Sequence, residues 1–338
     1  MKISRVGLDL AKNVFQVHGV DEHGKSVIQR QLQRGKVLTF FVQLEPCVIG
    51  MEACAGAHYW ARELSRQGHD VRLIAGQFVR PYRKSGKNDK NDAEAICEAV
   101  GRPNMRFVPI KSVEQQAELS LHRVRHLRVA ERTALVNQLR GLLGEYGIVI
   151  RQGIAHLRKA LPDILEDAEN GLPTLAREVF AELGDRLMEI DRQIDAYDHK
   201  IQRLAEYNQA AQRLMQIEGV GYLTASAIVA TIGDASCFSN GRQLAAWLGL
   251  TPRQHSSGGK ARLGGISKRG DVYLRTLLIH GARSALLQAA RRSDSKSRWA
   301  EAVKQRAGHN VAACALAAKN ARIMWALLAR DQEYRLAA

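Results

Sequence analysis

The chain has 338 residues, of which 46% are hydrophobic and 25% are charged, so it can form two or three globular domains. Fifty Lys and Arg against 34 Asp and Glu leave a formal charge of +16, which repels itself unless a polyanion binds. Nucleic acid is the favoured partner. A membrane surface is disfavoured as the partner, because the sequence shows neither an anchored amphipathic basic helix nor an apolar run near 18 residues.

The N-terminus and the cysteines predict a cytoplasmic protein. Asp9 and Lys12 interrupt the stretch that a signal peptide keeps apolar. The five cysteines are scattered and form no C-x-x-C pair. This pattern favours reduced thiols and argues against a zinc site.

The first hundred residues alternate between strand and helix signals. Strands are expected at residues 3–11, 14–21, 25–32, 47–53 and 70–76, with a helix at residues 59–68. Three antiparallel strands followed by βα units predict a mixed sheet that is covered by helices.

After Pro109 the sequence becomes helical. A capping box at Ser112 predicts a helix to about Gly147, which carries Arg123 among several arginines. A second long helix follows Pro173, with a heptad seam of apolar residues. The seam consists of Leu183, Leu187, Ile190, Ile194, Tyr197, Ile201 and Leu204. It could pack on the first helix of the same chain or on a second chain, and it favours a dimer.

The last third begins with a helix, a Gly-Val-Gly turn and another helix at residues 215–234. A further helix is expected at 241–250, then a loop rich in Gly, Ser and basic residues at 251–270, and helices from 271 onward. The predicted domains are therefore 1–147 with the long helix, a helical coiled-coil linker at 148–206, and 207–338.

Four carboxylates form the first candidate site. Asp9 interrupts the apolar strand "VGLDLA", Glu52 ends "CVIGMEA", and Asp89 and Asp92 share one helix face in "SGKNDKNDAEAI". A cluster of like charges raises its own pKa values unless cations neutralise it. Mg²⁺ prefers such oxygen ligands, and two ions can clamp a phosphodiester. The alternative is four separate, solvated acids.

The Gly-Val-Gly turn is the second candidate. Gly219 and Gly221 would leave backbone N–H groups at a helix N-terminus, where they suit a phosphate oxygen. The segment is typical of a helix-hairpin-helix, which grips nucleic-acid backbone. An ordinary tight corner between two helices is the alternative.

The basic loop is the third candidate. Ser256 and Ser257 precede two glycines, and four cations follow them. These cations are Lys260, Arg262, Lys268 and Arg269. Such a loop could wrap a phosphate, and an activated serine there could attack it, with His255 as a conceivable base. The alternative is a solvated loop that only contacts phosphates.

The order of these motifs resembles a known family. The motifs are "GLDLAK", "GMEA", "KNDKNDA", a coiled-coil stretch, "GVGYLTA", "AWLGLTP", "SSGG" and "SKRGDVYLRTLL". Together they resemble the DEDD transposases of bacterial insertion sequences, the group that includes the Piv/MooV-type DNA invertases. The resemblance covers nearly the whole chain.

The resemblance implies an α/β, RuvC-like domain of the ribonuclease-H type followed by a mostly α C-terminal domain. It implies that Mg²⁺ is bound by Asp9, Glu52, Asp89 and Asp92. The nucleophile would be Ser257, with its neighbour Ser256 still possible, and Lys87 and Lys90 would touch the DNA. It further implies a structured guide RNA and action at the bacterial nucleoid. The heptad seam suggests a dimer, and a paired synaptic complex would contain four chains.

Other functions remain open at this stage. A RuvC-like junction nuclease would need only the four carboxylates. A protein of the actin and sugar-kinase type would share the Gly-x-Asp of the first strand, although "LAKNVF" replaces the usual phosphate turn. A non-catalytic nucleic-acid scaffold would fit the basic charge but would give the carboxylates no task.

Overall fold

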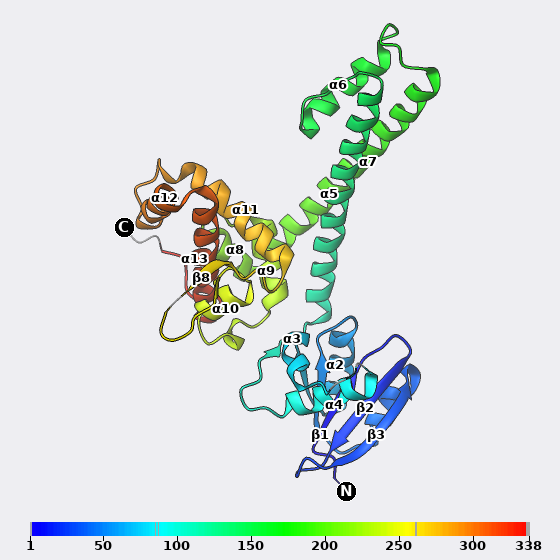
Figure 1. Cartoon of the computed structure of the whole chain (residues 1–338), viewed down its shortest axis with the longest axis vertical. Helices are drawn as coiled ribbons and strands as arrows, with labels where there is room; N and C mark the ends of the chain where they lie inside the picture. Colours follow the sequence, from blue (N-terminus) through cyan, green and yellow to red (C-terminus); the bar gives the residue numbers. More distant parts are fainter. Residues whose placement is uncertain (1, 85, 87, 261, 336–338) are drawn as a thin grey trace. The chain divides into compact units, whose positions relative to one another are not determined.

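The computed structural model of the chain describes residues 2–84, 86, 88–260 and 262–335. The chain divides into two compact units, Met1–Glu114 and Gln115–Ala338, and each is considered by itself (Figure 1). Lys87, one of the residues expected to touch DNA, lies outside the described residues.

The first unit is a mixed sheet with helices on both faces (Figure 1). Its elements are β1 (Arg5–Asp9), β2 (Val14–Val20), β3 (Ser26–Gln33), η1 (Arg34–Lys36), α1 (Val37–Phe41), β4 (Val48–Glu52), α2 (Ala57–Arg66), β5 (Asp70–Ile74), α3 (Gly76–Val79), η2 (Arg80–Tyr82), α4 (Asp89–Val100) and β6 (Phe107–Val108). The strand order is β3-β2-β1-β4-β5-β6. β1, β4 and β5 run parallel, whereas β2, β3 and β6 pair antiparallel with their neighbours. This sheet confirms the expected mixed α/β architecture and is compatible with a ribonuclease-H-type fold.

The two faces of the sheet bury different helices. Val6, Leu8 and Phe15 pack with Phe41 of α1 and Trp60 of α2 in one apolar cluster. The opposite face carries α4, whose small and aliphatic residues form a second cluster with β5 and α3. Alternating side chains of each strand point to opposite faces, so both layers stabilise the same strands.

The second unit is built on two long helices. Its elements are α5 (Val113–Glu145), α6 (Ile154–Glu166), α7 (Thr174–Tyr207), α8 (Gln209–Met215), α9 (Tyr222–Ile232), η3 (Ala235–Cys237), α10 (Gly241–Trp247), β7 (Pro252–Gln254), β8 (Leu263–Ile266), α11 (Val272–Ala289), α12 (Ser295–Ala307) and α13 (His309–Ala329). α5 and α7 run side by side with α6 beside them (Figure 1). Nearly all of α5 thus packs with the second unit, whereas the sequence analysis grouped it with the first domain.

The expected heptad seam is largely covered within the chain. Leu187, Ile190 and Ile194 of α7 are buried against Leu139 and Leu143 of α5 in one apolar cluster. The intrachain packing that the sequence left open therefore accounts for the middle of the seam. Leu204, at its end, stays exposed, so association with a second chain remains a prediction.

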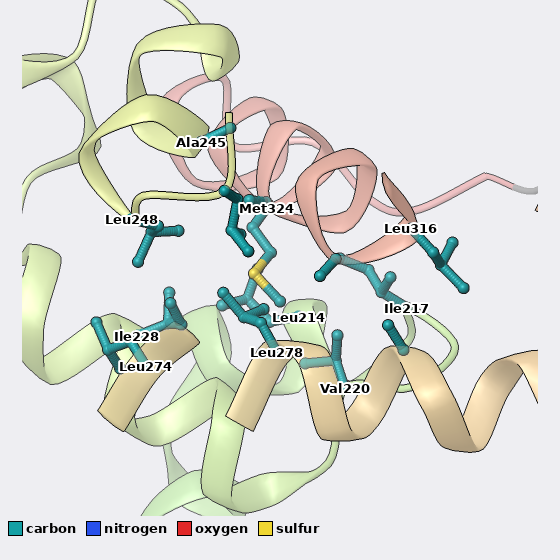
Figure 2. Packing of buried hydrophobic residues seen from close by; sticks show 14 of the residues in the cluster. Leu214, Ile217, Val220, Ile228, Ala245, Leu248, Leu274, Leu278, Leu316 and Met324 are labelled. Carbon is teal, nitrogen blue, oxygen red and sulfur yellow. The ribbon is translucent and has the colours of Figure 1, made fainter. Parts of the chain in front are cut away.

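The remaining helices enclose a second apolar core in this unit. Figure 2 shows Leu214 and Ile217, from α8 and the turn after it, meeting Leu278 of α11 and Met324 of α13. α13 is long and apolar enough to cross a membrane by length and composition alone. However, its Leu316 and Met324 are buried against neighbouring helices, so it serves here as a core helix.

One expected loop is a β-hairpin. β7 and β8 pair antiparallel within residues 251–270, where the sequence analysis expected only loop. Gly258 has φ +56° and Gly259 φ +77°, the left-handed pair that closes a two-residue hairpin turn. The strands are short and exposed, so no apolar alternation revealed them.

Candidate active site

Two of the four carboxylates end neighbouring parallel strands. Asp9 is the last residue of β1 and Glu52 the last of β4. Leu8 pairs with Met51 in the parallel register, so the next residue of each strand reaches the same edge of the sheet. Carboxyl ends of parallel strands are where open α/β sheets place their ligands.

Asp89 and Asp92 come from the first turn of α4, as the sequence predicted. The Asn88 side chain caps this helix by accepting a hydrogen bond of 2.8 Å from the Asn91 backbone N–H. α4 lies directly on the strands because two of their residues lack side chains. A β-carbon on Gly7 would lie 2.0 Å from the Ala93 carbonyl oxygen, and one on Gly50 would lie 2.7 Å from the β-carbon of Val100.

The four carboxylates act on one another electrostatically. Burial, then repulsion by Asp92, Asp89 and Glu52, raises the pKa of Asp9 to about 6. Burial, then Glu52 and Asp9, also raises the pKa of the nearby Cys54 thiol. Half-buried Asp9 therefore feels the charges of the other three carboxylates, although Asp89 is exposed, and a metal site shared by all four stays a prediction.

Two residues of this site escaped the sequence analysis. Arg83 forms an ion pair with Asp92, and both side chains are mostly buried. Gly76, at the start of α3, lies against the Glu52 carboxylate: a β-carbon there would be 2.3 Å from the carboxylate Oε1. Arg83 could have been suspected as one of several cations just before "KNDKNDA", but Gly76 carries no side chain that would signal a role.

The donor atoms of these side chains, though not their present spacing, suit a hard divalent cation. All four side chains offer carboxylate oxygens, the ligands that Mg²⁺ takes, and bound positive charge would relieve the repulsion felt by Asp9. Among the described residues, no group of three or more His, Cys, Asp or Glu is close enough to hold a metal as it stands. Arg83 already offsets the charge of Asp92.

The two serines lie at the tip of the β7–β8 hairpin in the second unit. The Ser256 hydroxyl accepts hydrogen bonds from the Gln254 side-chain amide at 2.9 Å and from the Arg262 backbone N–H at 3.3 Å. Ser257 is the first residue of the turn, and its carbonyl accepts the Lys260 N–H at 3.1 Å. Within the described part of the chain, the Ser257 hydroxyl has no hydrogen-bond partner, so it is the freer of the two.

The base of the hairpin is held by backbone contacts that only glycine permits. A β-carbon on Gly249 would lie 1.9 Å from the Arg269 carbonyl oxygen, and one on Gly270 would lie 2.0 Å from the Trp247 carbonyl oxygen. Arg275 of α11 is buried and donates to the Leu248 carbonyl at 3.2 Å. These residues fix where the hairpin leaves the core, and the sequence analysis missed the role of Arg275.

The other expected nucleic-acid contacts are exposed, apart from one in the glycine turn. Lys90, Arg123, Gly221, Lys260, Arg262, Lys268 and Arg269 are exposed, and Gly219 is half-buried. Lys268 has φ +54°, a backbone conformation that residues other than glycine rarely adopt. A depression of about 550 Å³ lies at the turn and is lined by Gly219, Gly221 and Arg292 among others. Gly219 packs backbone to backbone on Gly281 of α11.

Comparison with known proteins gives consistent matches. Residues 6–148 match a family model described as a transposase of the DEDD type, and residues 211–299 match the Transposase IS116/IS110/IS902 family. A Pseudomonas aeruginosa protein named "Probable family 20 transposase" is 55% identical over 99% of both chains. The transposase for insertion sequence element IS1111A of Coxiella burnetii is 46% identical over 99% of this chain and 92% of its own.

A more distant relative is the pilin gene-inverting protein of Moraxella lacunata, which is 24% identical over 76% of this chain and 75% of its own. None of these names describes a junction nuclease or an ATP-handling protein, so the comparisons favour the resemblance seen in the sequence. The chain belongs to the DEDD transposases of insertion sequences, in the IS116/IS110/IS902 family.

Proposed function

We propose that this transposase cuts and rejoins DNA with two sets of residues. Asp9, Glu52, Asp89 and Asp92 would hold Mg²⁺, and Ser257 would attack the DNA backbone. The single observation that supports the acidic set best is the raised pKa of Asp9, caused by burial and by the other three carboxylates. A site with such repulsion is suited to binding a divalent cation.

When bound, Mg²⁺ would neutralise charge on the scissile phosphate and orient it. The protein's own part is positional. The ends of β1 and β4 hold Asp9 and Glu52, and the capped start of α4 holds Asp89 and Asp92. Arg83 keeps Asp92 oriented and Gly76 leaves room for Glu52, so both act as positioning residues.

Ser257 would form the covalent link. Its Oγ attacks the phosphorus, a serine–phosphate ester forms, and the bond to the 3′ oxygen of the DNA breaks. The 3′ oxygen leaves with a proton as a free hydroxyl, and the serine proton passes to solvent. In rejoining, a 3′-hydroxyl attacks the same phosphorus and releases the serine. The exposed Ser257, whose hydroxyl has no hydrogen-bond partner among the described residues, and the exposed cations Lys260 and Arg262 support this role.

Two further parts of the proposal concern partners. The excess of positive charge suits DNA together with a structured RNA from the same element that selects the DNA sites. The exposed end of the α7 seam suits a dimer, and two dimers would form the synapsis. Copurification of a defined RNA with the protein tests the first part. The molecular mass of the protein in solution tests the second part.

The serine step is tested by comparing Ser257→Ala with Ser256→Ala. Incubation with DNA of the element, Mg²⁺ and copurified RNA should give a protein–DNA adduct that survives denaturation. We expect Ser257→Ala to abolish the adduct and to keep DNA binding, because only the attacking oxygen is removed. Ser256→Ala should keep most of the adduct, since its hydroxyl only braces the hairpin.

An adduct that persists in Ser257→Ala would refute this assignment. Metal-dependent cleavage with no adduct in the wild-type protein would instead support a nuclease without a serine step. Titration of Mg²⁺ into the wild-type protein and into Asp9→Asn tests the acidic set separately. Equal affinity in both proteins would exclude Asp9 as a ligand.

A further inference from the structure

Basic and aromatic residues follow one another along one face of α13 and onto Arg330, the residue after its end. Lys319, Arg322 and Arg330 follow one another at helical spacing, with Arg322 and Arg330 exposed and Lys319 half-buried. Arg242 of α10 and Trp299 of α12 flank this run, and Trp325 lies within it. These six residues, Arg242, Trp299, Lys319, Arg322, Trp325 and Arg330, are called the α13 groove below.

The α13 groove consists of adjoining depressions. One of about 450 Å³ is lined by Trp299, Lys319 and Arg322. Another of about 360 Å³ is lined by Arg242, Arg322, Trp325 and Arg330. Both include Arg322 and Ala326, so they are neighbouring depressions on the same part of the helix. From Lys319 to Arg330 they follow about 16 Å of helix.

Among the residues that the structure describes, no carboxylate forms an ion pair with the four cations of the groove, Arg242, Lys319, Arg322 and Arg330. Burial and the nearby charges of Arg322 and Lys296 lower the pKa of Lys319, and only Asp294 opposes them. Concentrated positive charge of this kind attracts phosphates.

The aromatic rings are held in place by this unit. The Trp325 indole N–H donates to the carbonyls of Ala235 at 3.2 Å and Phe238 at 3.0 Å. The Lys319 Nζ lies 4.3 Å from the centre of the Trp299 ring. α10 meets α13 closely because Gly241 has no side chain: a β-carbon there would lie 2.8 Å from the Arg322 α-carbon. The groove is thus preformed.

We propose that the α13 groove binds a single-stranded segment of nucleic acid, separately from the serine hairpin and the glycine turn. Its cations contact successive phosphates. Lys319 and Arg330 lie over the Trp299 and Trp325 rings, so unpaired bases meet only the parts of the indoles that line the depressions. Cations beside aromatic rings are the combination that suits single strands rather than duplexes. The shared chemistry is a single-stranded sugar–phosphate chain, which either DNA or the guide RNA can supply. The inference rests on the chain acting on nucleic acid but on neither the serine step nor the metal.

The test is the double substitution Arg242→Gln/Arg322→Gln in the full chain. Both side chains are exposed, so the fold should persist, as circular dichroism and thermal unfolding can verify. Arg186→Gln/Arg203→Gln on α7 is the matched control, because it removes the same charge from exposed arginines outside the groove. The probes are fluorescein-labelled oligo-dT, oligo-U and a duplex of equal length, titrated at several salt concentrations.

We expect the groove variant to bind its preferred single strand roughly tenfold more weakly than the wild type does. The slope of log affinity against log salt concentration should fall by about 1.4, because two phosphate contacts are lost. The control should stay within about twofold of the wild type. Selective loss with oligo-dT assigns the groove to DNA, and selective loss with oligo-U assigns it to RNA. Equal losses in the groove and control variants, or a loss confined to the duplex, overturn the proposal.

A second measurement needs no substitution. A strand that contains thiolated bases is cross-linked to the wild-type protein by ultraviolet light, and the attached peptides are identified by mass spectrometry. Cross-links to peptides of α13 and α12 support the groove. Cross-links confined to the β7–β8 hairpin and the glycine turn contradict it, whatever the catalytic outcome with Ser257→Ala.

Discussion

At the scale of single residues, the acidic site depends on a missing side chain as much as on those present. Gly76 touches the Glu52 carboxylate, and a β-carbon there would come within 2.3 Å of its Oε1. The obstructing atoms are the end of a flexible side chain, so Gly76→Ala should be accommodated by moving Glu52. We expect strand transfer to fall by about 10²-fold while the free energy of unfolding changes by less than about 1 kcal/mol.

Strand-transfer assays and urea unfolding of the same protein check this expectation. Gly35→Ala is the control in the same unit, because a β-carbon there meets nothing within 4 Å. Wild-type activity in Gly76→Ala would show that the position of Glu52 does not matter. A large loss of stability would show instead that the clash is relieved by the backbone.

The sequence pointed to the acidic residues but not to the residues that position them, and the reason is physical. Asp9 and Glu52 stand out because a charge at the end of an apolar strand is costly unless it has a task. Gly76 and Arg83 act through space on partners that no spacing rule connects to them. Likewise, Arg275 of "YLRTLL" could only be suspected as a charge in an apolar helix, and its acceptors could not be known.

At the scale of elements, the start of α4 controls the pair Asp89 and Asp92. The Asn88 side chain satisfies the Asn91 N–H, and the Asn91 side chain donates to the Gly86 carbonyl at 2.9 Å. Removing the cap by Asn88→Ala should cost about 1 kcal/mol locally and let the first turn fray. We expect hydrogen exchange of the Asn91 amide to become roughly fivefold faster, with strand transfer reduced.

Asn88→Ser is the matched variant, because serine can cap the same N–H. It should return the exchange rate and the activity close to wild-type values. If Asn88→Ala and Asn88→Ser lose activity equally, Asn88 acts through another contact than the cap. If neither variant changes the exchange of Asn91, the cap does not hold the turn.

Regular elements with apolar patterning were predictable, and elements without it were not. The five strands and the helix expected in the first unit all form, because strands that are buried on both faces, such as β1, β2 and β4, are short apolar runs in the sequence. The β7–β8 hairpin was not predicted, because its strands are exposed and because a Gly-Gly pair such as Gly258-Gly259 is equally typical of a flexible loop. The short helix α1 and the two-residue strand β6 were also missed.

At the scale of the whole molecule, one buried histidine in the second unit joins three helices. His122 of α5 is hydrogen-bonded through Nδ1 to the Tyr273 hydroxyl at 3.0 Å and through Nε2 to the Ser226 hydroxyl at 3.0 Å. Burial, then the charge of Arg125, lowers its pKa to about 4. The pKa of Asp9 in the first unit is shifted in the opposite direction, to about 6.

The contributions of Asp9 and His122 to stability should therefore respond to acid in opposite directions. Below about pH 6 the folded first unit takes up a proton at Asp9 that the unfolded chain, with a pKa of 3.8, does not, so the fold gains stability down to about pH 4. In the second unit the unfolded chain protonates His122 near pH 6.5, whereas the folded unit resists until about pH 4, so stability is lost over that range.

Between pH 7 and pH 4, in EDTA and without nucleic acid, we expect Asp9 to add about 1–2 kcal/mol to the first unit, after allowance for its partial exposure. His122 should remove about 2–3 kcal/mol from the second unit. Urea unfolding followed by pulsed hydrogen exchange reports each unit separately. Each contribution is the difference in midpoint between the wild type and the variant that lacks the residue, measured at both pH values.

Single substitutions assign each trend to its residue. Asp9→Asn should remove the acid gain of the first unit only, and His122→Gln the acid loss of the second unit only. Exposed Glu22→Gln and His199→Gln are controls that should leave both trends as in the wild type. A trend that survives its own substitution would mean that other groups set the response. Mg²⁺ should abolish the gain at Asp9, because a bound cation favours the ionised carboxylate and thereby opposes the shift of its pKa.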